Sequence, residues 1–133
     1  MKPIFVYGTL LPGCPNSDLW SGDATVVPAK LAGFRLVSWH GHFPYAIPAD
    51  DEVTVGALLY PDVTAYEWLL NRLDHLEGVP FHYDRREVVV QVGESFVVAW
   101  VYTPNDPEEY EEDRQIPNND WFAFKAMTKD LSL

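Results

Sequence analysis

The sequence has a single cysteine, Cys14, among its 133 residues. One thiol excludes a disulfide within the chain and a metal cluster held by several cysteines. Basic residues are also scarce, because 9 lysines and arginines stand against 20 acidic residues, a formal net charge of −11. An acidic surface repels phosphate backbones and anionic lipid headgroups, so we expect neither nucleic-acid nor membrane partners.

Long hydrophobic runs are missing as well. No apolar run approaches the roughly 20 residues that a membrane-spanning helix requires. The first ten residues, MKPIFVYGTL, have an apolar run that is too short for a secretory signal. We therefore expect a soluble protein of the cytoplasm. The chain does have 47% hydrophobic and 14% aromatic residues, which is enough for a core, and its length predicts a single domain over residues 1–133.

Apolar runs bounded by turn residues predict an α+β fold, in which a curled sheet or small barrel has one helix packed on it. The expected strands cover residues 2–7, 24–38, 53–60, 86–92 and 95–103. The second should be interrupted near Pro28 and Gly33, and Gly93-Glu94 should form a tight hairpin. Consecutive apolar residues in the last two strands predict that both of their faces are covered.

Two segments near the C-terminus have a different composition. Residues 104–114 (PNDPEEYEEDR) are acidic and contain two prolines, which predicts a solvated loop. Residues 121–127 (WFAFKAM) are expected to form a short closing helix that docks through its aromatic side chains.

The clearest helix is predicted over residues 64–77, with Thr64 and Glu67 at capping-box spacing and Gly78 as its stop. At about 100° per residue, its apolar side chains fall on one stripe, whereas most of its polar ones fall outside. The stripe contains Tyr66, Leu69, Leu70, Leu73 and Leu76. The polar residues expected to face water are Glu67, Asn71, Arg72, Asp74 and His75.

Glu77 is the exception, because its angle lies between those of Tyr66 and Leu70, within the apolar stripe. Burial disfavours the ionised carboxylate, and the negative end of the helix dipole opposes an anion there. Both effects raise the pKa of Glu77 toward neutrality, as a general acid/base requires. The alternative is a last-turn glutamate that faces solvent or pairs with a nearby arginine.

The turn at residues 6–13, VYGTLLPG, is the second unusual feature. Gly8 and Gly13 have the spacing of a phosphate-binding loop, but Cys14 and Pro15 stand where such a loop has its lysine and hydroxyl. Exposed N–H groups in this turn can still hold a carboxylate, since an anion-binding nest requires main-chain amides and no particular side chain. A plain connection between strand and loop remains the alternative.

Other candidate residues have weaker support. His40 and His42 can share one strand face, but spacing places no third ligand beside them, so we expect no metal site. Cys14 has no base nominated by the sequence that would activate its thiol.

Four segments together resemble the gamma-glutamylcyclotransferase-like proteins, and most closely the small gamma-glutamylamine cyclotransferases and AIG2-like proteins. The segments are VYGTL at 6–10, LDHLEGVP at 73–80, YDRREVVV at 83–90 and AWVY at 99–102. The likeness spans roughly residues 4–103, with a weaker similarity at 116–121.

The resemblance implies a small mixed β-barrel with flanking helices. It also implies an enzyme that converts a gamma-glutamyl amine or gamma-glutamyl peptide to 5-oxoproline and the free amine or amino acid. Glu77 matches the family's acid/base glutamate. The residues that match its substrate-binding positions are Tyr7, Gly8, Thr9, Leu10, Tyr83, Arg85 and Tyr102. The family's reaction is intramolecular and requires no metal or organic cofactor, so the implied partner is a small-molecule gamma-glutamyl substrate.

One segment departs from the family pattern. Asn118-Asn119-Asp120-Trp121 stands where many members have a Ser-Gly-Asp-Trp-like turn, which leaves the far wall of the pocket and the preferred leaving amine open. Two other functions also stay open, a non-catalytic binding module for a gamma-glutamyl or amino-acid-like ligand and a related acyl transfer. The sequence does not indicate an oligomeric state.

Overall fold

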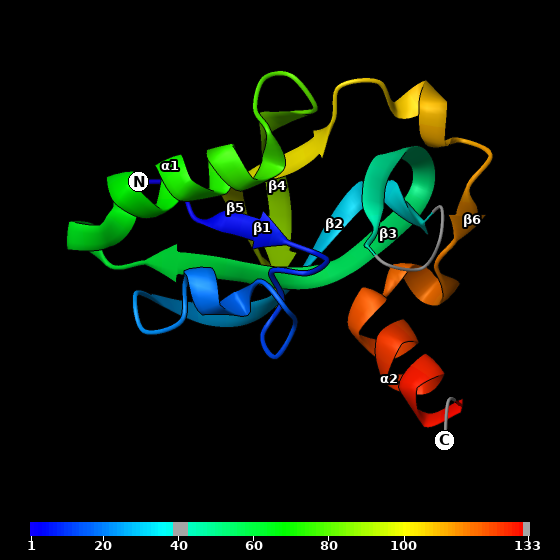
Figure 1. Cartoon of the computed structure of the whole chain (residues 1–133), viewed down its shortest axis with the longest axis horizontal. Coiled ribbons are helices and arrows are strands. Elements are labelled where there is room, and N and C mark those ends of the chain that lie inside the picture. Colours follow the sequence, from blue (N-terminus) through cyan, green and yellow to red (C-terminus); the bar gives the residue numbers. More distant parts are fainter. Residues whose placement is uncertain (39–42, 132–133) are drawn as a thin grey trace.

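The computed structural model describes residues 1–38 and 43–131. Five strands close into a mixed barrel in the order β3-β1-β5-β4-β2, with β2 returning to pair with β3 (Figure 1). Only β1 and β5 are parallel, and the other pairs are antiparallel. The strands are β1 Ile4–Val6, β2 Ala24–Ser38, β3 Tyr45–Pro61, β4 Tyr83–Val92 and β5 Ser95–Pro104. The predicted barrel is confirmed.

The two longest strands confirm only part of their predicted form. In β2 the predicted irregularity near Gly33 is confirmed by a register shift between Ala32 and Phe34, where Gly33 has a φ of +88°, whereas the strand runs unbroken through Pro28. β3 begins at Tyr45, well before the predicted start at residue 53. Its first half is strand because it pairs with the second half of β2, a long-range partner that no local pattern reveals.

Helix α1, Tyr66–Glu77, lies across one end of the barrel and follows a 3-10 turn, Val63–Ala65 (Figure 1). The predicted capping box is wrong, since no side chain caps either element. The predicted stop is confirmed: Gly78 has a φ of 67°, and the next N–H, that of Val79, donates to the Asp74 carbonyl at 3.0 Å. Glycine adopts this left-handed conformation without strain.

The apolar stripe of α1 points into the barrel core, except at its last turn. Tyr66, Leu69 and Leu73 are buried. Leu76 is instead 43% exposed, which corrects its predicted burial. The last turn of the helix lies over a cavity, so Leu76 and Glu77 line that cavity and not the core.

The outer face of the β4–β5 hairpin is exposed, so the predicted cover on both faces is wrong. Gly93 and Glu94 form the predicted tight link between the paired residues Val92 and Ser95. On the outer face, Val89 is 57% exposed and Phe96 70% exposed. Their apolar character reflects the fit of branched and aromatic side chains to an extended backbone and not burial on both sides.

The C-terminal segment wraps the far end of the barrel. It contains a 3-10 turn at Pro107–Tyr110, the short strand β6 Arg114–Gln115 beside β2, a second 3-10 turn at Pro117–Asn119, and helix α2 Trp121–Leu131. The predicted loop 104–114 is thus partly ordered. The predicted closing helix is confirmed, with Trp121 1% exposed. Among the described residues, neither helix has the length and apolarity needed to cross a bilayer.

Asn118 and Asn119, which stand where the family pattern has a glycine-containing turn, form a turn here. Both adopt positive φ, 58° and 52°. Asparagine tolerates this region better than most residues. The buried Asn119 side chain accepts the N–H of Leu36 at 2.9 Å and donates to Glu52 at 2.8 Å, so it joins β2 to β3. The turn therefore stabilises the fold.

Candidate active site

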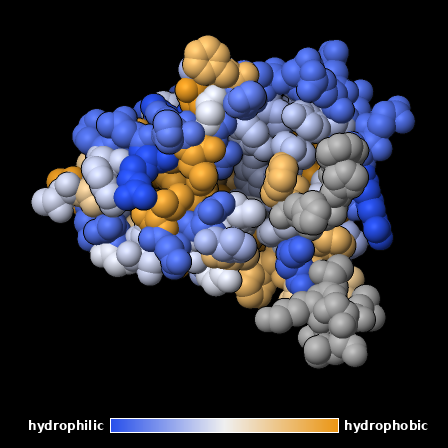
Figure 2. Space-filling model, viewed as in Figure 1, coloured by the Kyte–Doolittle hydropathy of each residue, from blue (hydrophilic) through white to orange (hydrophobic). Residues whose placement is uncertain are grey.

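A cavity of about 440 Å³ opens between the end of α1, the turn after β1 and the start of β4. Figure 2 shows apolar residues at the surface between α1 and the segment that follows β1, within a mostly hydrophilic face. Apolar walls with a few convergent polar groups are typical of small-molecule sites. The polar groups that line this cavity belong to Tyr7, Gly8, Thr9, Asn16, His75, Glu77, His82, Tyr83 and Tyr102.

The turn after β1 presents unused main-chain donors. Its carbonyl oxygens are occupied: that of Gly8 by the N–H of Leu11 at 2.9 Å, that of Thr9 by the N–H of Asn16 at 2.9 Å, and that of Leu10 by the indole of Trp20 at 2.7 Å. The N–H groups of Gly8, Thr9 and Leu10 donate to no oxygen of the described residues. Since buried amides are normally paired, these N–H groups form a site for an acceptor such as a carboxylate.

Gly8 is required at this turn because Pro44 is close. A Cβ at position 8 would lie 2.7 Å from Cγ and 2.8 Å from Cδ of Pro44, which lines the same cavity. The glycine therefore permits Pro44 and the main chain of the turn to lie against each other.

Glu77 lies at the inward end of α1 and lines the cavity, as its angular position predicts. Desolvation by burial raises the pKa of its carboxyl from the usual 4.5 to about 7. Such a group exchanges a proton readily near neutral pH, as a general acid/base requires.

Tyr7, Tyr83 and Tyr102 stand around Glu77. Burial, strengthened by the nearby Glu77 charge, raises the pKa of each phenol, so all three stay protonated. The Tyr7 hydroxyl donates to the Tyr102 carbonyl at 2.6 Å, and the Tyr102 hydroxyl donates to Asp74 at 2.7 Å. The Tyr83 hydroxyl has no hydrogen-bond partner within the described chain, so it is the one phenol of the three that is free to donate to a ligand.

Aromatic contacts tie the wall of the cavity to the acidic segment. The ring of Tyr83 lies 6.2 Å from that of Tyr45, which stacks on Tyr110 at 4.1 Å. Tyr110 ends the 3-10 turn within residues 104–114, and this stack explains why part of the predicted loop is ordered.

The structure brings the predicted site residues to this cavity with one exception. Arg85 is not among the lining residues. Its guanidinium pairs with Asp74 at 2.9 Å and lies over the Trp100 ring at 4.5 Å. Asp74 itself, expected to face water, is only 24% exposed. The sequence did contain a signal for this position of Asp74. Asp74 precedes Glu77 by three residues, and residues three apart share one face of a helix.

The remaining histidines and the cysteine differ in their relation to the site. His75, which was expected to face water, and His82 both line the cavity. Cys14 does not, and burial raises the pKa of its thiol, which disfavours the reactive thiolate. His40 and His42 lie outside the described residues. Within residues 1–38 and 43–131, no cluster of histidine, cysteine and carboxylate side chains could hold a metal ion.

Comparisons with known proteins agree with this geometry. The crystal structure of an AIG2-like protein from Mus musculus superposes with a TM-score of 0.71 at 26% identity, covering 87% of this chain and 86% of that one. YkqA from Bacillus subtilis gives a TM-score of 0.75 at 22% identity, covering 97% of this chain but only 42% of YkqA. This chain therefore spans less than half of that relative.

A solved gamma-glutamyl cyclotransferase gives a TM-score of 0.63 at 22% identity, over 87% of this chain and 72% of that one. No curated protein matched the chain in sequence. The family model for gamma-glutamyl cyclotransferase, AIG2-like, matches residues 4–123, which include the barrel, the turn after β1 and all of α1. The chain therefore belongs to the gamma-glutamyl cyclotransferase, AIG2-like family.

Proposed function

We propose that the protein converts a gamma-glutamyl amine or gamma-glutamyl peptide to 5-oxoproline and the free amine or amino acid, with Glu77 as general base and acid. The observation that carries the proposal is the pairing of two features in one cavity. One is a carboxyl with a pKa of about 7, and the other is a turn with three N–H groups that donate to no oxygen of the described residues. The first suits proton transfer and the second suits an α-carboxylate.

The chemistry requires one substrate and no external nucleophile. The turn N–H groups of Gly8, Thr9 and Leu10 hold the α-carboxylate, and the Glu77 carboxylate takes a proton from the α-ammonium group. The free amine then attacks the γ-carbonyl carbon. As the bond to the leaving nitrogen breaks, Glu77 returns the proton to that nitrogen. The attacking nitrogen loses its second proton to the same departing amine, so a five-membered lactam and an ammonium are released. Holding the chain bent for ring closure is a proximity effect, which lowers such barriers by several kcal/mol.

Tyr83 fits a separate role in this reaction. Its hydroxyl is protonated and has no acceptor within the described part of the chain, so it can donate to the γ-carbonyl oxygen as negative charge develops there. A donor aimed at a developing oxyanion stabilises the transition state more than the ground state.

The direct test is an assay of purified protein with a panel of gamma-glutamyl amines and gamma-glutamyl dipeptides, with 5-oxoproline measured by mass spectrometry. Release of 5-oxoproline from at least one substrate is the expected result. Binding without release from any of them favours the non-catalytic binding module. Transfer of the glutamyl group to an added amine, without 5-oxoproline, favours the acyl transfer.

Replacing Gly8 by valine is expected to weaken substrate binding by about tenfold or more, because the new side chain collides with Pro44 and displaces the turn N–H groups. The KM for the best substrate of the panel measures this effect. Gly8→Ala adds a smaller side chain, so its KM should lie between those of Gly8→Val and wild type. Pro12→Ala is the control, since Pro12 is an exposed residue of the same turn that does not line the cavity. An unchanged KM in Gly8→Val contradicts the placement of the carboxylate.

Replacing Tyr83 by phenylalanine is expected to lower kcat by about a hundredfold with little change in KM, because only the oxyanion donor is removed. The aromatic ring and its packing against Tyr45 remain. Steady-state kinetics measure the change, and Tyr60→Phe on the exposed end of β3 is the control. If KM rises and kcat stays at the wild-type value, Tyr83 binds the substrate in its ground state and the oxyanion role is wrong.

A further inference from the structure

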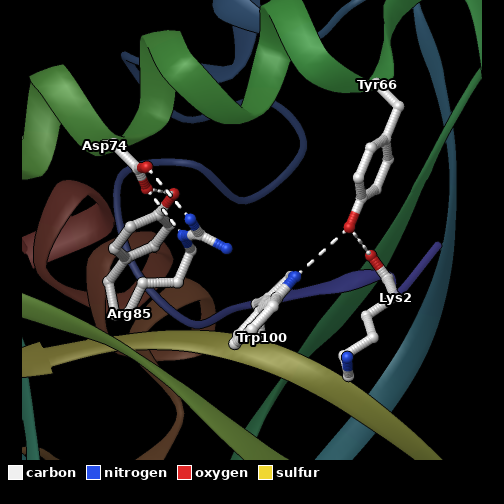
Figure 3. Close-up of polar contacts among 6 residues, drawn as sticks. Lys2, Tyr66, Asp74, Arg85 and Trp100 are labelled. Atoms are coloured by element: carbon white, nitrogen blue, oxygen red, sulfur yellow. Dashed lines mark hydrogen bonds and ion pairs between the residues drawn. The ribbon is translucent and has the colours of Figure 1, made fainter.

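Asp74 is the hub of a polar network that the reaction scheme above does not use. It lies on α1 one turn before Glu77 and faces the strands (Figure 3). Its Oδ1 accepts the Tyr102 hydroxyl at 2.7 Å and the Nε of Arg85 at 2.9 Å, and its Oδ2 accepts Nη2 of Arg85 at 3.3 Å. Hydrogen bonds with charged partners on both sides are stronger than neutral ones.

This arrangement fixes the direction of the Tyr102 hydroxyl. A carboxylate paired with an arginine only accepts hydrogen bonds, so the hydrogen of Tyr102 must point to Asp74. The other end of the residue is held as well, because its carbonyl accepts the Tyr7 hydroxyl at 2.6 Å. The hydroxyl oxygen of Tyr102 therefore has lone pairs but no hydrogen to offer to a ligand, and Tyr102 is one of the residues that line the cavity.

The partners of Asp74 are themselves restrained. The Arg85 guanidinium lies 4.5 Å from the centre of the Trp100 ring. The Trp100 indole donates to the Tyr66 hydroxyl at 3.2 Å, and that hydroxyl donates to the Lys2 carbonyl at 2.9 Å (Figure 3). Because Tyr66 begins α1 and Asp74 lies near its end, the network holds both ends of the helix against the barrel.

We propose that Asp74 is a positioning residue that keeps Tyr102 as a hydrogen-bond acceptor for the α-ammonium group of the ligand. The identity of this head group rests on the proposed function. An ammonium group only donates, so it is matched by an acceptor oxygen beside the Glu77 carboxylate. A carboxylate or carbonyl oxygen placed against the Tyr102 hydroxyl oxygen receives no hydrogen from it. The site therefore recognises the amino group of the head as well as its carboxylate.

The test compares two ligands that differ only in that amino group, L-glutamate and glutarate, by titration calorimetry. Wild-type protein is expected to bind glutamate at least about tenfold more tightly, since a hydrogen bond to a charged group contributes that much. Tyr102→Phe and Asp74→Ala should each remove most of this preference and change glutarate affinity less than about twofold. The double variant should be no worse than either single variant, because both act on one contact.

Control variants separate this role from a general loss of structure. Glu67→Gln removes an acidic group from the exposed first turn of the same helix and should keep the wild-type preference. A purely structural defect weakens both ligands by the same factor, and that result overturns the inference. Tyr102→Phe leaves the Asp74–Arg85 pair in place, so it remains a test if Asp74→Ala does not fold.

The 5-oxoproline assay on the same proteins keeps the two proposals apart. Turnover by wild type together with an unchanged ligand preference in both variants refutes the role of Asp74 but not the function. Loss of the preference in a protein that turns over no gamma-glutamyl compound refutes the function but not the role of Asp74. Wild-type protein with no preference for glutamate refutes the role of Asp74 directly.

Discussion

Glu77→Gln is expected to lower kcat by about a thousandfold while the protein stays folded and still binds substrate. Glutamine keeps the size and the polar character of the side chain but accepts no proton, and general acid–base catalysis contributes about 10²–10⁴-fold to rates. The amine then stays protonated and does not attack, and the leaving nitrogen receives no proton. Release of 5-oxoproline under substrate saturation measures the effect.

Glu67→Gln is the matched control, because it makes the same chemical change on the exposed first turn of the same helix. It should turn over at the wild-type rate. The dissociation constant of the best substrate from Glu77→Gln, measured by calorimetry, should remain within severalfold of the wild-type KM. Wild-type turnover by Glu77→Gln excludes this residue as the acid/base, whatever the family of the chain.

The second large effect is on stability. We expect the ionisation of Glu77 to lower the free energy of unfolding as the pH rises from about 4.5 to about 7. The pKa of Glu77 is about 7 in the folded protein, whereas its ordinary value of 4.5 applies to the unfolded chain. Between these values the folded state binds more protons than the unfolded state, so the free energy of unfolding falls with increasing pH. A difference of this size corresponds to at most roughly 3 kcal/mol, since one pKa unit is about 1.4 kcal/mol.

Glu77→Gln removes this cost, so the variant should be more stable than wild type above pH 7 by up to roughly 3 kcal/mol and equal to it near pH 4. Urea unfolding of both proteins at pH 4, 5.5, 7 and 8 measures the difference. The comparison cancels the titration of other groups. Those facing Glu77 are His75 on its own helix, His82 after it, and the phenols of Tyr7, Tyr83 and Tyr102.

Two results contradict this prediction. A constant difference between the proteins from pH 4 to pH 8 means that Glu77 has an ordinary pKa and faces solvent. A variant less stable than wild type at pH 8 means that the ionised carboxylate has a stabilising partner in the folded protein. The expected gain in stability with loss of turnover is the usual cost of an active-site charge.

Local pattern was sufficient for most elements and for the key residue. The helical angle alone placed Glu77 inward among Tyr66 and Leu70, and the structure confirms that placement at the cavity. Gly78 as helix stop and Gly93 in the hairpin were also predictable, because each position requires a conformation that glycine adopts freely. These features depend on residues only a few positions apart.

Local pattern failed wherever a distant partner decides the outcome. Asp74 was expected to face water, but Arg85 and Tyr102 from two other strands make it a partly buried acceptor. The same pairing holds Arg85, which the family resemblance implied as a substrate-binding residue, away from the cavity lining. The first half of β3 was missed because its partner is the far half of β2.

The sequence by itself determined most of the strands, the helix with its inward glutamate, the glycine-containing turn and, through four short segments, the family. Each of these depends on backbone conformation and side-chain periodicity, which neighbouring residues set. Only the tertiary structure decided that the N–H groups of Gly8, Thr9 and Leu10 meet no acceptor among the described residues, that burial raises the pKa of Glu77 to about 7, and that the Tyr102 hydroxyl donates to Asp74. The desolvation of a carboxyl and the direction of a hydrogen bond depend on which residues contact each other across the barrel. Closure of the barrel brings those residues together.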